Sequence, residues 1–534
     1  MIKKIHIENY KKFENITIIP NDGLNIIVGD NESGKTTLLE AIYLALRGGL
    51  GGISFGADIT PHLFNKDAVA AYVKAVKEGK NPELPEIVIE LYLEDTKDTG
   101  FLRGTNNSLE EDCPGVRVRI AFSQDFTDEY LKFLEAREDV DTVPAEYYRM
   151  DRTSFSGSSI TNRSLPFGVS LIDASRIRLK SGSDYYMQRI IEDNLTDQQR
   201  VELARAYRRL KEEFARDKSI GVINASLVES TDSITDKKLS MSIDVSSQAA
   251  WETSLVPHLD DLPFHFAGNG EQHMLKILLA LARNVDTSHV ILVEEPENHL
   301  SFSSLSRLIS KIAAGCAGKQ VILTTHSSFV INKLGLEQLL LLNGQDVMKL
   351  TDLRKDTQAY FKKLAGYDTL RIVLASKTIL VEGPSDELVV QRAYWDKHGA
   401  LPIERGIDVL SVRGLSFKRF LDIAKLLARE VRVVTDNDGD PEKVAAKYKD
   451  FNECETIQVF VGSDAALKTL EDQIAGVNDL DVMNALLGTS FTSKSDLVSH
   501  MKDPSNKTEC ALKVFDSETT IKMPSYIVEA IGSV

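Results

Sequence analysis

The stretch that decides the fold is GDNESGKTT, Gly29–Thr37. It matches G-x-x-x-x-G-K-[ST] and lies between an apolar run and TTLLEAIYLALRGG, which has helical spacing and then Gly48-Gly49 as a stop. Glycines in such a loop let backbone N–H groups surround phosphate oxygens, the lysine reaches the β- and γ-phosphates, and the threonine hydroxyl ligates Mg²⁺. We therefore predict a nucleotide site whose candidates are Gly29, Asn31, Glu32, Ser33, Gly34, Lys35, Thr36 and Thr37.

A phosphate-binding loop of this kind predicts an acidic strand elsewhere in the chain. HVILVEEPENHL, residues 289–300, supplies four apolar residues followed by Glu294 and Glu295. Glu294 is expected to hold Mg²⁺ through water, and Glu295 to orient or deprotonate the attacking water. The structural alternative is a buried strand that ends in a solvated acidic turn.

Two further segments resemble parts of the ABC-type ATPases. FAGNGEQHMLKILLAL, with Gly268, Gly270 and Gln272, resembles their signature loop, and VILTTHSS resembles their switch-histidine loop, with His326 at a strand end. A lone histidine there would otherwise be a structural hydrogen-bonding group. The resemblance implies that the signature loop of one subunit covers the nucleotide of another, so that the ATPase is at least a dimer. The glutamine loop is not placed, with Gln124 and Gln188 as weak candidates.

Composition and length bound the remaining choices. The 534 residues predict two or three domains, and 43% hydrophobic with 27% charged residues is ordinary for a soluble protein. The net charge of −16 argues against a general nucleic-acid coat, although a local basic groove is compatible with it. Neither a membrane span nor a signal-peptide core is recognisable. The four distant cysteines suggest neither disulfides nor zinc, and a cytoplasmic protein is expected.

The middle of the chain contains a charged helical stretch. Residues 185–216 are predicted to be helical, and Leu203, Tyr207, Leu210 and Phe214 form one apolar stripe along them. The stripe suits either an ordinary amphipathic helix on the core or a helical insertion that makes a dimer contact. Before it, the β-rich runs in residues 85–122 predict a hairpin-like region, and SLPFGVSL, residues 164–171, is interpreted as a loop.

A second set of acidic residues lies in the C-terminal third. LVEGPSDELVV, residues 380–390, ends a predicted strand at Glu382, bends at Gly383 and places Asp386 one helical turn later; VVTDNDGD, residues 433–440, ends another strand with Asp436 and Asp438. Acids at the ends of neighbouring parallel strands converge in the crevice beyond the sheet. Carboxylate oxygens are the ligands that Mg²⁺ and Mn²⁺ prefer. The pattern predicts a cation site that meets a phosphodiester.

E-G-x-x-D-E followed by SVRG and D-x-D resembles the Toprim domain of topoisomerases, primases and a class of nucleases. In that resemblance Gly414 allows close backbone approach, and Arg413 or Lys418 contacts phosphate. An ABC-type ATPase followed by Toprim resembles the OLD (overcoming lysogenization defect) family of ATP-dependent nucleases, which includes Gabija-type and retron-associated members. The family pattern adds Glu471, in LKTLEDQI, as a metal ligand and Lys507, in NKTECALKVF, as the residue that stabilises charge on the scissile phosphate.

These resemblances imply an α/β architecture with two parts. An ABC-type P-loop ATPase head would occupy residues 1–180 and 221–350, with a helical dimerisation insertion at 181–220, and a linker at 351–376 would lead to a Rossmann-like Toprim domain at 377–534. The implied cofactors are ATP and Mg²⁺ (or Mn²⁺). The metal ligands would be Glu382, Asp386, Asp436, Asp438 and Glu471 in Toprim and Thr36 in the head, and the catalytic residues Glu295, Lys507 and Glu382.

The function expected from the family is an ATP-regulated, metal-dependent DNA endonuclease or nickase in anti-phage defence. Its partners would be DNA, further copies of the chain as a dimer or tetramer, and a defence partner such as a helicase or retron nucleic acid. Two alternatives stay open: a DNA-bound ATP switch or scaffold with an inactive Toprim domain, and topoisomerase-like strand passage, for which Tyr394, Tyr448 and Tyr526 are the available tyrosines. Primase chemistry is less favoured because no zinc-binding cysteine cluster is present.

Overall fold

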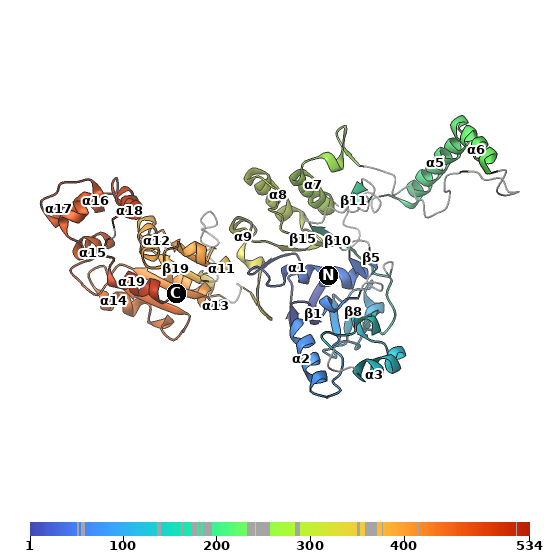
Figure 1. Ribbon diagram of the computed structural model, residues 1–534, viewed down its shortest axis with the longest axis horizontal. Helices are drawn as coiled ribbons and strands as arrows, with labels where there is room; N and C mark the ends of the chain where they lie inside the picture. Colours follow the sequence, from blue (N-terminus) through green and yellow to red (C-terminus); the bar gives the residue numbers. More distant parts are fainter. Residues whose placement is uncertain are drawn as a thin grey trace. The chain divides into compact units, whose positions relative to one another are not determined.

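A computed structural model describes most of the chain in two compact units (Figure 1). The first unit is Met1–Leu165 with Ile322–Val534, and the second is Pro166–Val321. The described residues are 1–50, 53–54, 59–135, 140–161, 164–173, 179–180, 183–184, 195–231, 241, 257–282, 289–349, 353–357, 371–375, 377–413, 416–519 and 521–534. In these ranges no helix is both long and apolar enough to cross a membrane.

An antiparallel sheet opens the first unit. The strand β1 (Ile2–Tyr10) pairs with β2 (Phe13–Ile18) and β6 (Ile87–Leu93), β6 pairs with β8 (Cys113–Phe122), and β8 pairs with β9 (Tyr148–Ser154) and the short β7 (Arg103–Gly104). The hairpin predicted within 85–122 is confirmed: Ile89 lies opposite Val118, and every residue of β6 is buried. Two helices, α2 (Lys66–Lys77) and α3 (Thr127–Glu135), and the pair β4 (Gly49–Leu50) and β5 (Ile53–Ser54) accompany it.

The nucleotide loop is preceded and followed by the predicted elements. The fully buried strand β3 (Leu24–Val28) ends just before Gly29, and α1 (Lys35–Arg47) starts just after Gly34. Gly48 caps α1 in the left-handed region at φ 66°, which confirms the predicted stop. Within the same unit, β17 (Leu339–Asn343) runs parallel to β3 and antiparallel to β18 (Asp346–Lys349), with α9 (Ser328–Leu334) before them.

The second unit contains a parallel strand pair. The strand β10 (Gly168–Asp173) runs beside β15 (His289–Glu294), with Leu171 opposite Leu292. The interpretation of residues 164–171 as a loop is therefore wrong from Gly168 onward. Val169, Leu171 and Ile172 are buried, and the strand is stabilised by a partner more than a hundred residues away, which a local pattern does not show. The helices α7 (Asn269–Ala282) and α8 (Phe302–Gly315) lie where the sequence predicts them, and β16 (Lys319–Thr324) follows.

Two helices and two short strand pairs are also present among the described residues of this unit. The helix α5 (Asp197–Ala215) begins at a capping box formed by Thr196 and Gln199, and α6 (Lys218–Thr231) follows at once. The predicted helix 185–216 is thus present from 197; residues 185–194 lie outside the described residues. Leu210 and Phe214 of the predicted stripe are 61% and 54% exposed, whereas Leu203 and Tyr207 are partly buried. The strand pairs are β11 (Leu179–Lys180) with β12 (Ser183–Asp184) and β13 (His258–Leu259) with β14 (Leu262–Pro263).

The C-terminal part is built on a four-stranded parallel sheet. Its order is β20 (Ile407–Ser411), β19 (Lys377–Val381), β21 (Glu430–Thr435) and β22 (Ile457–Val461), after the short helix α11 (Arg371–Leu374). The crossover helices are α12 (Pro384–His398), α13 (Phe417–Leu426) and α14 (Pro441–Lys447). Five more follow: α15 (Leu470–Val477), α16 (Leu480–Leu487), α17 (Lys494–Lys502), α18 (Lys507–Asp516) and α19 (Ser525–Gly532).

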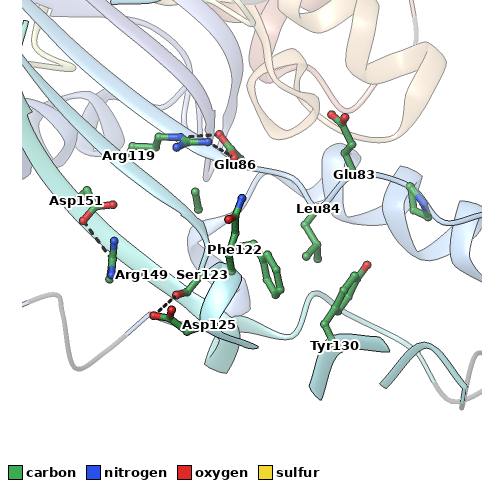
Figure 2. Close-up of a pocket in the computed structure, with 13 residues that line it drawn as sticks. Glu83, Leu84, Glu86, Arg119, Phe122, Ser123, Asp125, Tyr130, Arg149 and Asp151 are labelled. Carbon is green, nitrogen blue, oxygen red and sulfur yellow. Dashed lines mark hydrogen bonds and ion pairs between the residues drawn. The ribbon is translucent and has the colours of Figure 1, made fainter. Parts of the chain in front are cut away.

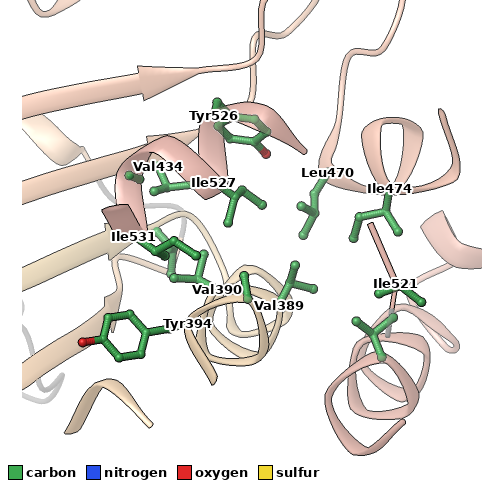
Figure 3. Close-up of a cluster of buried hydrophobic side chains, with 14 of the residues drawn as sticks. Val389, Val390, Tyr394, Val434, Leu470, Ile474, Ile521, Tyr526, Ile527 and Ile531 are labelled. Atoms are coloured by element: carbon green, nitrogen blue, oxygen red, sulfur yellow. The ribbon is translucent and has the colours of Figure 1, made fainter. Parts of the chain in front are cut away.

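One hydrophobic cluster joins this sheet to its late helices (Figure 3). Val389 and Val390 of α12 lie among Leu470 and Ile474 of α15 and Ile527 of α19, each at most 3% exposed. Burying such side chains contributes about 1.5–3 kcal/mol each. The cluster therefore fixes α15 and α19 against the helix that begins beside Glu382.

Candidate functional site

The nucleotide loop has a geometry suited to phosphate. Lys35 is 6% exposed, and its ammonium donates to the carbonyl oxygens of Gly29 at 2.9 Å and Asp30 at 2.8 Å, which closes the loop on itself. Gly34 has φ 101°, and a Cβ there would lie 2.7 Å from the Phe13 ring. Ser33 Oγ is buried and has no hydrogen-bond partner among the described residues. An anion bound at the start of α1 would face backbone and side-chain hydrogen-bond donors.

The histidine loop of the first unit starts beside the strand that leads to this site. Thr325 N donates to the Ile27 carbonyl of β3 at 3.2 Å, one residue before His326. Ser327 Oγ then accepts from Val330 N and caps α9. His326 is partly buried at the end of β16, as the strand-end prediction required.

In the second unit, the acidic strand end and the signature-like loop approach each other closely. Glu294 ends β15, and Glu295 adopts φ 45° and accepts from Asn298 Nδ2 at 2.8 Å. A Cβ on Gly270 would lie 2.2 Å from the His299 carbonyl oxygen, so only glycine fits there. Gln272 is buried and donates to the Ala267 carbonyl at 2.8 Å, which holds its own loop together.

The second site lies at the carboxyl ends of neighbouring strands. Glu382 follows β19 and Asp436 follows β21, which pair in parallel. The Glu382 carboxylate accepts from the Thr435 hydroxyl and, at 3.3 Å, from Asp436 N. Asp386 Oδ2 accepts from Gly383 N at 3.0 Å, which closes the first turn of α12. The predicted convergence of Glu382, Asp386 and Asp436 at one sheet edge is therefore observed.

Glu471 and Lys507, the two residues predicted from the family resemblance, lie on helices near the end of the chain. Lys507, the first residue of α18, places its ammonium 2.8 Å from Glu471 Oε1 near the start of α15. The Glu471 side chain is only 6% exposed, whereas that of Lys507 is 43% exposed. Lys507 thus reaches the acidic cluster from the solvent side and neutralises its most buried carboxylate.

The electrostatics of the cluster show that its acids share one environment. Burial, then repulsion by Glu382, raises the pKa of Asp386 to about 6, although Lys507 opposes the rise. Burial, followed by repulsion from Asp386 and Glu382, raises the pKa of Asp436 to about 8, against a hydrogen bond from the Leu470 backbone. Burial alone would lower the pKa of Lys507, but its bond to Glu471 and the nearby acids outweigh that, and the pKa is raised. Burial and the like charges of neighbouring acids thus account for the two raised aspartate pKa values.

The cluster meets the chemical requirements of a divalent cation. Its donors are carboxylate oxygens, and Asp436 Oδ1 and Glu471 Oε2 are buried without a hydrogen-bond partner among the described residues. Over the same residues, no group of three or more His, Cys, Asp or Glu side chains already stands at metal-binding spacing. Ligand type and burial therefore fit Mg²⁺ or Mn²⁺.

The other predicted residues of this region are placed less centrally. Asp438 is exposed on the turn after β21, at φ 52°. Arg413 is exposed at φ 51°, and Gly414 lies outside the described residues. Lys418 lines a separate cavity of about 350 Å³ with Arg354 and Asp422. None of these three described side chains is joined to the acids around Glu382 by a hydrogen bond or ion pair in the described part of the chain.

Two tyrosines that sequence reasoning could not place lie beside the cluster. Tyr526 of α19 is 4% exposed, and burial followed by the charges of Asp436, Asp386 and Glu382 holds its pKa well above the usual range. Burial, then Glu382 and Asp438, raises the pKa of Tyr448 to about 12. Figure 3 shows Tyr526 within the hydrophobic cluster. No sequence signal connects these residues with the acids, because only the tertiary fold brings them there.

Gln124, the first candidate for the glutamine loop, lies at the end of β8 and is exposed. It lines a cavity of about 680 Å³ with Arg119, Glu86 and Tyr130 (Figure 2). Arg119 is held by Glu86 at 2.8 Å and Arg149 lies 3.3 Å from Asp151, so the cations at this cavity are paired. The second candidate, Gln188, lies outside the described residues.

Two protein-family models match separate parts of the chain. Residues 24–332, more than half of the chain, match the family described as "AAA domain, putative AbiEii toxin, Type IV TA system". Residues 373–438 match "Overcoming lysogenization defect protein-like, TOPRIM domain". The second match includes Glu382, Asp386 and Asp436 and ends before Glu471 and Lys507.

Individual relatives match over short stretches. The DNA replication and repair protein RecF of Shewanella piezotolerans (strain WP3 / JCM 13877) is 41% identical over 83 residues, which is 15% of this chain and 22% of that protein. RecF of Desulforamulus reducens (strain ATCC BAA-1160 / DSM 100696 / MI-1) is 47% identical over 47 residues, 9% of this chain and 13% of that protein. This chain therefore matches less than a quarter of the length of either relative.

Solved structures give a weaker likeness. The Smc head domain with an extended coiled coil bound to the C-terminal domain of ScpA, derived from Pyrococcus furiosus, is 13% identical, covers 68% of this chain and 99% of that one, and has a TM-score of 0.35. The SmcHead bound to the C-winged helix domain of ScpA is 14% identical, covers 66% and 98%, and scores 0.34.

Proposed function

This chain belongs to the AAA-domain family matched by residues 24–332 and carries an OLD-like Toprim domain, and from that premise we propose that it is an ATP-regulated, divalent-metal-dependent DNA endonuclease or nickase. The observation that supports the chemistry is the acidic cluster at the edge of the β19–β21 sheet. Its carboxylates are partly or fully buried at one sheet edge, and a lysine enters the cluster from the solvent side.

In the proposed site, Glu382, Asp386, Asp436 and Glu471 hold the cations, with Asp438 available from the exposed turn. Bound Mg²⁺ or Mn²⁺ would supply an activated water and would steady the leaving 3′-oxygen in an in-line displacement. The Lys507 side chain is 43% exposed and its ammonium contacts Glu471 on one side, so another N–H of that ammonium can reach a phosphate oxygen and neutralise charge as the phosphorus becomes pentavalent. The hydrogen bonds from Thr435 and Asp436 N keep the Glu382 carboxylate turned toward the sheet edge.

The ATPase head is proposed to control this site. Lys35 and Thr36 would bind the nucleotide phosphates and Mg²⁺, and Glu294 and Glu295 would serve ATP hydrolysis. We propose that nucleotide state gates DNA access or cutting within a dimer or tetramer, without one hydrolysis per cut. The exposed apolar residues of α5, Leu210 and Phe214, support a contact with another copy there.

A role in anti-phage defence, together with a partner such as a helicase or retron nucleic acid, is proposed from the family alone. Topoisomerase-like strand passage is the weaker alternative. It needs a tyrosine that reaches a phosphate and ionises, whereas Tyr394, Tyr448 and Tyr526 are each at most 4% exposed. Burial also raises the pKa of Tyr448 and of Tyr526, which opposes their use as nucleophiles.

The test is incubation of supercoiled plasmid with the full chain and Mg²⁺ or Mn²⁺, with and without ATP. Nicked or linear product is expected from the wild type. Glu382→Gln, which keeps the size of the side chain but removes its charge, should form no product while ATP hydrolysis continues. Product formation by Glu382→Gln at the wild-type rate would show that cutting occurs elsewhere. ATP and DNA binding without any cut by the wild type would favour the scaffold with an inactive Toprim domain.

A further inference from the structure

The residue between the two aspartates of the D-x-D motif is fully buried. Asn437 is 0% exposed, although Asp436 is only partly buried and Asp438 is exposed. Its side-chain Nδ2 donates to the carbonyl oxygens of Gly462 at 3.0 Å, Asp464 at 2.8 Å and Leu467 at 3.1 Å. All the donors of one amide are therefore used to hold a single backbone segment.

The same side chain also fixes its own turn. Asn437 Oδ1 accepts from Gly439 N at 2.8 Å, which shapes the turn that carries Asp436 and Asp438. An aspartate would lack the donors and would set a negative charge against three carbonyl oxygens, and a leucine would leave those oxygens unpaired. Asparagine suits this position because it both donates and accepts.

The segment that Asn437 holds leads directly to a proposed ligand. Residues 462–469 connect the end of β22 at Val461 to the start of α15 at Leu470, and Glu471 is the second residue of that helix. The segment packs closely on α15, since a Cβ on Gly462 would lie 2.4 Å from Gln473 Oε1.

We propose that Asn437 is a positioning residue of the metal site, which sets the separation between the carboxylates of Asp436 and Glu471. This inference rests on the proposed function, because it concerns the same cation site. Asn437 touches neither the cation nor DNA. It acts by binding the connection to α15 onto the D-x-D turn, so that ligands from two strands and a later helix are held in one arrangement before the cation arrives.

The chain offers a matched control at the other end of α15. Asn478 is 6% exposed, its Nδ2 donates to the carbonyl oxygens of Ile474 and Lys522 at 2.9 Å each, and its Oδ1 accepts from Lys522 N at 2.9 Å. It is a buried asparagine that bonds backbone groups, as Asn437 is. It lies at the C-terminal end of the helix, away from Glu471 at the beginning.

The experiment compares Asn437→Ala with Asn478→Ala in the full chain without nucleotide. Mn²⁺ affinity is measured by calorimetry, the midpoint of thermal unfolding is measured in EDTA, and plasmid cutting is followed over a range of Mn²⁺ concentrations. Both variants should unfold at a lower temperature than the wild type. Asn437→Ala should weaken Mn²⁺ binding by about 10- to 100-fold and raise the Mn²⁺ needed for half-maximal cutting by a similar factor. Asn478→Ala should shift either quantity less than about threefold.

Equal Mn²⁺ affinity for Asn437→Ala and the wild type would overturn the inference, and so would equal losses in the two variants. If Asn437→Ala does not fold, Asn437→Ser, which retains a short donor and acceptor, takes its place with the same expected order of affinities. The calorimetry separates this inference from the proposed function. If the wild type binds Mn²⁺ but cuts no plasmid, the proposed nuclease activity is refuted. The Mn²⁺ affinities of the variants then still decide the role of Asn437.

Discussion

The affinity of the acidic cluster for Mn²⁺ should rise steeply with pH, because the cation must displace protons from two carboxyl groups. Asp436 has a pKa of about 8 and Asp386 of about 6 in the metal-free protein. Only the ionised form of each binds the cation. Between pH 6 and pH 8 the ionised fraction of Asp436 rises from about one in a hundred to about a half, and that of Asp386 from about a half to nearly one. Together these changes predict a gain of roughly 100-fold in affinity, or about 2.7 kcal/mol.

The assay is calorimetric titration of the nucleotide-free protein with Mn²⁺ at pH 6, 7 and 8, repeated in two buffers with different enthalpies of ionisation. The second buffer gives the number of protons released, which should be between one and two at pH 6 and fall as pH rises. The matched variant Asp436→Asn should bind Mn²⁺ more weakly. Its affinity should change only about twofold between pH 6 and pH 8, which is the change due to Asp386 alone. A wild-type affinity that stays constant across this range, with no proton release, would refute the assignment of these carboxyl groups as ligands.

Three further predictions concern the ATPase head and the stability of the cluster. Lys35→Ala should abolish ATP hydrolysis in a phosphate-release assay, since this ammonium is the proposed phosphate ligand of the loop, yet cutting without nucleotide should persist. Loss of both activities in a folded variant would argue against separate sites. Lys507→Met leaves the Glu471 carboxylate buried without the lysine ammonium, so the free energy of unfolding in urea should fall by about 1–3 kcal/mol in EDTA, and Mn²⁺ should largely restore it. An equal loss with and without Mn²⁺ would contradict this. In EDTA, the wild-type free energy of unfolding should fall as pH rises from 5 to 8. Unfolded aspartate ionises near 3.8 and native Asp436 only near 8, so in this range the native state binds more protons than the unfolded state. Asp436→Asn should make the free energy of unfolding less dependent on pH.

Much of the fold could be predicted because its signals are local. The strand before Gly29, the helix after Gly34 and its stop at Gly48 are set by apolar periodicity and by glycine, and each lies where the sequence predicts it. The same holds for Glu382 and Asp436. Acids at the ends of parallel strands must meet at one edge once β19 and β21 are neighbours.

What the sequence does not show depends on distant partners. The strand β10 is short and pairs with β15, so its buried residues form no pattern long enough to separate a strand from a loop. Tyr526 lies beside the acids only because α19 packs on α12 in the hydrophobic cluster. Asn437 resembles any turn asparagine until the structure shows that its amide holds the connection that leads to Glu471.

The most direct test of the central claim is a crystal structure of the nucleotide-free protein grown with Mn²⁺, with diffraction data collected at the manganese absorption edge. The account predicts an anomalous peak within coordination distance of carboxylate oxygens from Glu382, Asp436 and Glu471, beyond the ends of β19 and β21. A peak bound only elsewhere, or an acidic cluster left without manganese at millimolar Mn²⁺ and pH 8, would contradict it.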